Sequence, residues 1–75
     1  MAMTDMNEFR RLKLIWQAEK SALANAEAEI DALFEDWIDG RGNRPTKEML
    51  EQLCEYRHNE YEARGAVDLY ISENI

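Results

Sequence analysis

One short segment contains most of the residues that interrupt regular structure. "DGRGNRP", residues 39–45, holds two of the three glycines and the only proline. Glycine and proline are unfavourable inside helices, so this segment divides the chain into two parts. Apolar residues on both sides recur every three or four positions, the period of an amphipathic helix. The sequence predicts an all-α fold in one domain, residues 1–75, with helix 5–39, turn 40–45 and helix 46–73.

Residues at the ends of the two expected helices support these boundaries. Thr4 or Asp5 can cap the start of the first helix, and Gly40 can end it in the left-handed conformation that glycine adopts easily. Thr46 is well placed as the N-cap of the second helix. Because the connection is short, we expect the helices to form an antiparallel two-helix hairpin.

The apolar stripes of both helices are wider than the single seam that a hairpin provides. Each large apolar side chain left in water forgoes about 1.5–3 kcal/mol of burial. We therefore expect two hairpins to form a homodimer with the architecture of a four-helix bundle. In the alternative, the apolar stripes are buried against a different protein. The expected interface anchors are Trp16, Phe34, Trp37, Leu53, Tyr56 and Val67.

Several charged residues fall within the apolar stripes. A hairpin that reverses in the middle of the breaker segment pairs residues whose numbers add up to about 85, so Glu27 should face Arg57 and Glu19 should lie near Arg64. Glu60 lies one turn from each arginine. We expect these charges to set the register or specificity of the assembly rather than its stability. In the alternative, the arginine stems lie along the core and their head groups reach solvent.

A possible metal motif occurs in the second helix. Glu55 and His58 have a Glu-x-x-His spacing, with Cys54 beside them. Metal sites in helical bundles need such side chains to project inward. On a helical wheel, Glu55 and His58 fall on the side opposite Leu53, so we expect a solvated face, with no metal ligand and no cofactor.

The charge distribution limits the classes of function. The net charge of −7 argues against direct binding to nucleic acid or to an anionic membrane, both of which require clustered Lys and Arg. Residues 27–39 hold six acidic and no basic side chains, whereas residues 8–20 have a net charge of +2. We expect a small acidic protein–protein interaction module (an adaptor, regulator or inhibitor) that docks on a basic protein through an apolar helical face and an acidic end. The alternatives are a DNA mimic that inhibits a nucleic-acid-binding protein, a metal-binding helical bundle, and an acidic surface that only maintains solubility.

Enzymatic activity is not expected, since the chain has no nucleophile elbow and no glycine-rich phosphate loop. We therefore assign no catalytic and no cofactor-binding residue. The N-terminal "MAMTDMNEF" lacks the apolar core of a signal peptide, and no apolar stretch approaches the length of a membrane span. A single cysteine suits a reducing compartment, so we expect a cytoplasmic protein.

Overall fold

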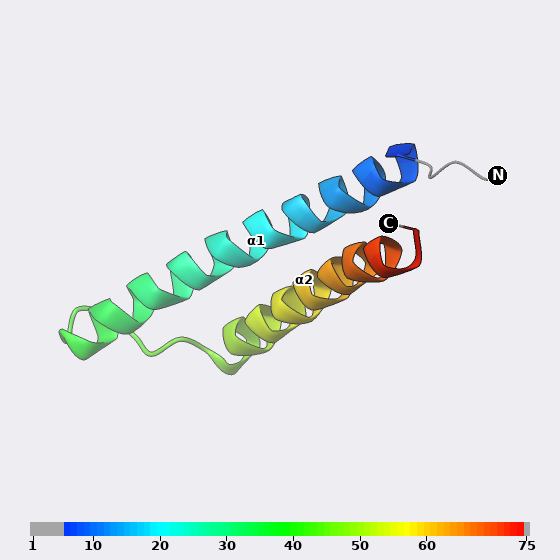
Figure 1. The fold of residues 1–75 in the computed structure, drawn as a ribbon. Coiled ribbons are helices and arrows are strands. Elements are labelled where there is room, and N and C mark those ends of the chain that lie inside the picture. Colours follow the sequence, from blue (N-terminus) through cyan, green and yellow to red (C-terminus); the bar gives the residue numbers. More distant parts are fainter. Residues whose placement is uncertain (1–5, 75) are drawn as a thin grey trace.

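The computed structural model describes residues 6–74, which form two helices, α1 (Met6–Ile38) and α2 (Lys47–Asn74). The helices run antiparallel, side by side, and the start of α1 and the end of α2 lie at the same end of the hairpin (Figure 1). The predicted all-α helical hairpin is confirmed. The expected cap at Thr4 or Asp5 lies outside the described residues.

Both ends of the connection have the geometry that the sequence indicated. Gly40 has a φ of 77°. Its N–H donates to the carbonyl oxygen of Trp37, and the N–H of Arg41 donates to the carbonyl oxygen of Asp36. These two bonds form a Schellman motif, which satisfies the last carbonyls of α1. At the start of α2, the N–H of Met49 donates to Thr46 Oγ1 at 3.2 Å, so Thr46 is the N-cap.

The register of the hairpin differs from the expected one. Trp16 contacts Glu60 and Phe9 stacks on Tyr70, so facing residues have numbers that add up to 76 and 79. The expected value of about 85 is wrong because the chain does not reverse symmetrically. After the Schellman motif, the connection runs back along α1 before α2 begins (Figure 1). In this register α2 starts opposite about residue 32, so residues 33–38 of α1 project beyond it.

The core of the hairpin is small. Its buried apolar residues within the helices are Ile30, Leu53, Ala63 and Val67, and none of the described large side chains is completely buried. The molecule is a rod of 64 × 15 × 14 Å with a radius of gyration of 17.4 Å. A compact domain of this length has a radius of gyration of about 11 Å. The seam between the helices therefore encloses only a small part of the apolar material.

Candidate functional site

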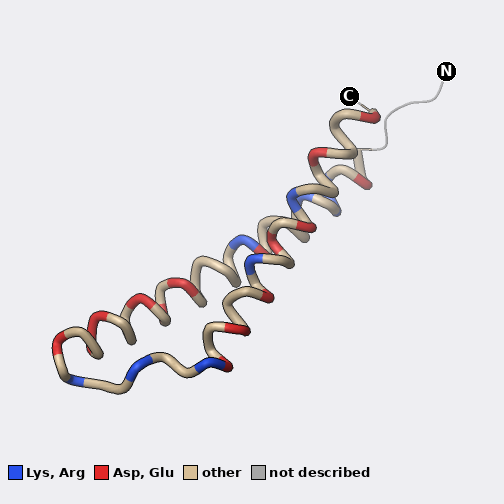
Figure 2. The backbone as a smooth tube through the Cα atoms, turned by 90° about the horizontal axis from the view of Figure 1, so that it is seen from below, with Lys and Arg blue, Asp and Glu red and all other residues tan. Residues whose placement is uncertain are grey.

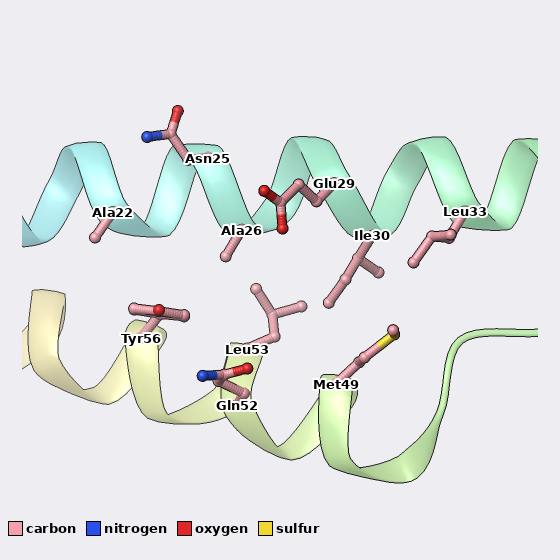
Figure 3. A pocket seen from close by; sticks show the side chains of 10 residues that line it. All are labelled: Ala22, Asn25, Ala26, Glu29, Ile30, Leu33, Met49, Gln52, Leu53 and Tyr56. Atoms are coloured by element: carbon pink, nitrogen blue, oxygen red, sulfur yellow. The ribbon is translucent and has the colours of Figure 1, made fainter.

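A groove of about 430 Å³ runs along one broad side of the seam (Figure 3). Its wall on α1 contains Ala22, Ala26, Ile30 and Leu33, with Asn25 and Glu29 at the edge. Its wall on α2 contains Met49, Gln52, Leu53 and Tyr56. We call this set of ten residues the alanine groove. The small side chains of Ala22 and Ala26 do not reach α2, so a depression remains beside the seam (Figure 3).

On the opposite broad side of the hairpin, two lysine side chains lie over aromatic rings. Lys13 Nζ lies 5.9 Å from the ring centre of Phe9, and Lys20 Nζ lies 5.3 Å from that of Trp16. Lys20 and Ala22 are two positions apart, which separates them by about 160° around α1. The lysine stems shield the apolar rings on their side while the ammonium groups remain in water. The two broad sides therefore differ, and the alanine groove is the less shielded one.

One polar network crosses the seam at mid-length. The indole N–H of Trp16 donates to Glu60 Oε1 at 3.1 Å, and Arg64 Nε lies 4.0 Å from the same oxygen. The Glu60 side chain is only 15% exposed, whereas that of Arg64 is 48% exposed. A carboxylate with this little exposure requires such partners, because an unpaired one is costly to desolvate. This network fixes the relative position of the two helices at one point.

The other expected register charges lie at the edges of the seam. Glu19 and Glu27 are half-buried, and Arg57 is exposed. Among residues 6–74, no ion pair joins Glu27 to Arg57 or Glu19 to Arg64. The pairing inferred from the wrong register is therefore wrong as well, since a shift of six or more residues moves each charge about two turns along its partner helix.

The turn end of the hairpin is acidic and partly apolar. Acidic positions follow one another along the turn-proximal half of α1 (Figure 2). Arg41 pairs with Asp39 at 2.9 Å and with Asp36 at 3.5 Å. Within this acidic surface, the ring centres of Phe34 and Trp37 lie 6.4 Å apart, and Trp37 is 45% exposed. These aromatic residues are accessible because α2 does not extend alongside residues 33–38.

The other end of α1 is basic. Arg11 Nε donates to Glu8 Oε2 at 3.1 Å. This hydrogen bond and the attraction of the carboxylate raise the pKa of Arg11, which is cationic at any physiological pH. The Lys and Arg positions of α1 lie towards this end, away from the acidic turn (Figure 2).

The residues expected as interface anchors separate into three groups. Leu53 and Val67 are buried between α1 and α2, at 7% and 4% exposed. Trp16, Phe34 and Tyr56 are half-buried, Trp16 and Tyr56 beside the seam and Phe34 on the overhang of α1. Trp37 is exposed on the overhang of α1. Only the last two groups have surface to offer to another molecule.

The residues of the possible metal motif lie on the outer surface of α2. Cys54, Glu55 and His58 are all exposed. His58 Nε2 lies 3.7 Å from Glu62 Oε1, one turn along the same helix. Within the described part of the chain, no three His, Cys, Asp or Glu side chains come together as metal ligands do.

The alanines of the groove were not among the expected interface anchors. The expected anchors are larger apolar side chains, most of them aromatic, whereas the groove exists because Ala22 and Ala26 are small. A signal was present, since Ala18, Ala22 and Ala26 recur every four residues on one side of α1.

The comparisons with known proteins provide no relative. No protein family model, no curated protein and no solved structure matches this chain. Within residues 6–74, neither helix is long and apolar enough to cross a membrane.

Proposed function

We propose that the protein is a small acidic interaction module that pairs with a second copy as a four-helix bundle and binds a basic protein through its acidic turn end. The observation that carries this proposal is the large area that the single hairpin leaves in water. Its accessible surface is 6034 Å², whereas a compact monomer of 8.8 kDa exposes about 4,800 Å².

The excess of about 1,200 Å² exceeds the roughly 800 Å² that one partner contributes to a protein–protein interface of standard size. The exposed surface also includes large apolar side chains on both helices, such as Ile15, Met49 and Ile71. Burial of such side chains against a second hairpin would extend the small core, which argues for association as the working state.

The acidic turn end has the composition of a docking surface for a basic partner. Carboxylates attract a basic protein over a distance of about 8–10 Å, and an accessible aromatic pair provides short-range contact area. Trp37 and Phe34 lie among Asp31, Glu35 and Asp36, so both contributions are available at one place. We assign partner binding to this end, and no catalytic step.

Light scattering over a dilution series tests the self-association. We expect twice the chain mass of 8.8 kDa in 0.15 M salt and also in 1 M salt, since apolar burial is not screened. A mass of one chain at every concentration would contradict this part of the proposal.

The partner-binding part requires its own experiment. Immobilised protein should retain a basic protein from a cell extract, and the Asp31→Asn, Glu35→Gln double variant should retain much less of it. The matched control neutralises two exposed acids near the middle of α2, Glu55→Gln and Glu62→Gln, and should bind as the unchanged chain does. Equal retention by all three proteins would contradict the assignment of the acidic end.

A DNA mimic is the second candidate, and it rests on the spacing of exposed carboxylates. Asp31 and Glu35 in α1 and Asp39 directly after it follow one another at four-residue intervals and are all exposed. A mimic should compete with duplex DNA for its partner, whereas an adaptor should bind a partner that already holds DNA. A competition assay with labelled duplex DNA therefore separates the two functions.

A further inference from the structure

We propose that the alanine groove is the self-association surface, and that two hairpins meet there antiparallel, α1 against α1 and α2 against α2, about a two-fold axis near Ala22. This inference rests on the proposed self-association and adds the surface, the orientation and the residues in contact. In this arrangement the groove of each chain is filled by side chains of the second copy.

The choice of surface follows from the difference between the two broad sides. The opposite side carries lysine side chains over Phe9 and Trp16, and these would have to be displaced or desolvated by a second hairpin. The groove side presents Ala22, Ala26 and Leu33. Small side chains let two helices approach closely, so a second helix can reach the groove floor.

The groove continues along α1 as a stripe of the same side. Steps of three and four residues connect Leu33, Glu29, Ala26, Ala22, Ala18 and Ile15. The stripe is nearly symmetric about Ala22, which is the middle residue of α1, because Ala18 and Ala26 lie one turn to either side. Tyr56 lies opposite Ala22 across the groove, so the same axis passes through both helices (Figure 3).

An axis at Ala22 places a large side chain where the groove is empty. In an antiparallel pair, residues at equal distances from the axis face each other, so Ile15 of the second copy lies opposite Glu29, between Ala26 and Leu33 of the first. Ile15 is 42% exposed in the single hairpin and is therefore available for this contact. By the same symmetry, Ile15 of the first chain enters the alanine groove of the second copy.

Charge complementarity selects the antiparallel orientation. Residues 8–20 have a net charge of +2 and residues 27–39 have a net charge of −6. Antiparallel pairing brings the basic part of each α1 beside the acidic part of the other. On the groove side, Arg11 comes one turn from Glu29 of the second copy. A parallel pair would instead place α1 on α2 and gather both acidic turn ends at one end, with like charges within screening distance.

Cysteine cross-linking tests the surface and the orientation together. In a Cys54→Ser background, Ala22→Cys should form a covalent dimer under mild oxidation, because a residue on the two-fold axis faces its own copy within the Cα separation that a disulfide allows. Ala18→Cys and Ala26→Cys should cross-link only when the two variants are mixed. The control, Ala24→Cys, lies about 160° from Ala22 around the helix and should remain uncross-linked.

A second pair of variants gives an independent readout of the same surface. Ala22→Glu should reduce the mass seen by light scattering from two chains to one, and Ala24→Glu should leave it at two chains. If the unchanged chain is dimeric but Ala22→Cys forms no covalent dimer, the groove or the antiparallel orientation is wrong while self-association stands. If the unchanged chain has the mass of one chain at every concentration, the proposed self-association fails first.

Discussion

A Gly65→Ala substitution tests whether the outer surface of α2 stays exposed to solvent in the working molecule. Gly65 lies inside α2, and apart from its chain neighbours and the adjoining helix backbone no atom lies within 4 Å of the place that an alanine Cβ would occupy. Within a helix, glycine is about 0.8–1.0 kcal/mol less favourable than alanine. Because the added methyl group meets no neighbour, we expect the free energy of unfolding to rise by about this amount.

The corresponding shift in melting temperature is large enough to measure. An unfolding entropy of about 2.1 cal/mol/K per residue gives about 160 cal/mol/K for 75 residues. The midpoint should therefore rise by about 5–6 °C. Circular dichroism of thermal unfolding measures it, with all variants compared at one chain concentration, because association makes the midpoint concentration-dependent.

The same chemical change at Gly40 should have the opposite sign. Gly40 adopts a φ of 77°, which costs an alanine about 1–2 kcal/mol, so Gly40→Ala should lower the midpoint. If Gly65→Ala lowers the midpoint as well, or changes the mass in solution, another chain packs closely against Gly65. That result would refute both the exposed outer surface of α2 and the alanine groove as the dimer surface.

Further substitutions examine the seam and its polar network. Leu53→Ala should lower the free energy of unfolding by about 2–5 kcal/mol, because Leu53 is 7% exposed. Leu14→Ala should change it by less than about 0.5 kcal/mol, because Leu14 is 65% exposed. Denaturant unfolding measures both values, and equal losses would contradict the placement of the core. Glu60→Ala should cost about 1–3 kcal/mol because it leaves the half-buried indole N–H of Trp16 without its acceptor. Glu60→Gln keeps an acceptor oxygen and should lower the free energy of unfolding much less. Equal losses in the two variants would show that this hydrogen bond does not contribute to stability.

The sequence was sufficient to predict the hairpin because local signals agree with one another. The breaker segment, the period of the apolar residues and the caps at Gly40 and Thr46 all indicate two helices and one reversal, and each depends only on neighbouring residues. The structure confirms both caps and the all-α hairpin.

The register could not be predicted from the same signals. It depends on how far the chain travels between Gly40 and Thr46, and glycine and proline spacing does not determine that path. The segment runs back along α1, Pro45 is buried, and α1 gains an overhang. Pairs that the sequence placed together, such as Glu27 and Arg57, are thereby separated, whereas the contact between Trp16 and Glu60 is one that the expected register did not contain.

The candidate surface was only partly predictable for a different reason. Large apolar residues can be identified by type, so Trp16, Phe34 and Trp37 were evident. A groove instead forms where small side chains leave the space beside them unfilled. Ala22 and Ala26 become informative only when the helix opposite them is known. Leu53 and Val67 illustrate the reverse case, since their size suggested an interface but the seam already buries them.

The antiparallel arrangement has a consequence for partner binding that can be measured. It places the two acidic turn ends at opposite ends of the bundle, and each retains Phe34, Trp37 and Ile38 on the part of α1 that α2 does not reach. Two basic partners should then bind one dimer independently, one at each end, with equal affinity in a calorimetric titration. Trp37→Ala should weaken both sites equally, since each overhang contributes the same aromatic contact. A parallel bundle would merge the two acidic ends into one site, so saturation at one partner per dimer would contradict the antiparallel orientation.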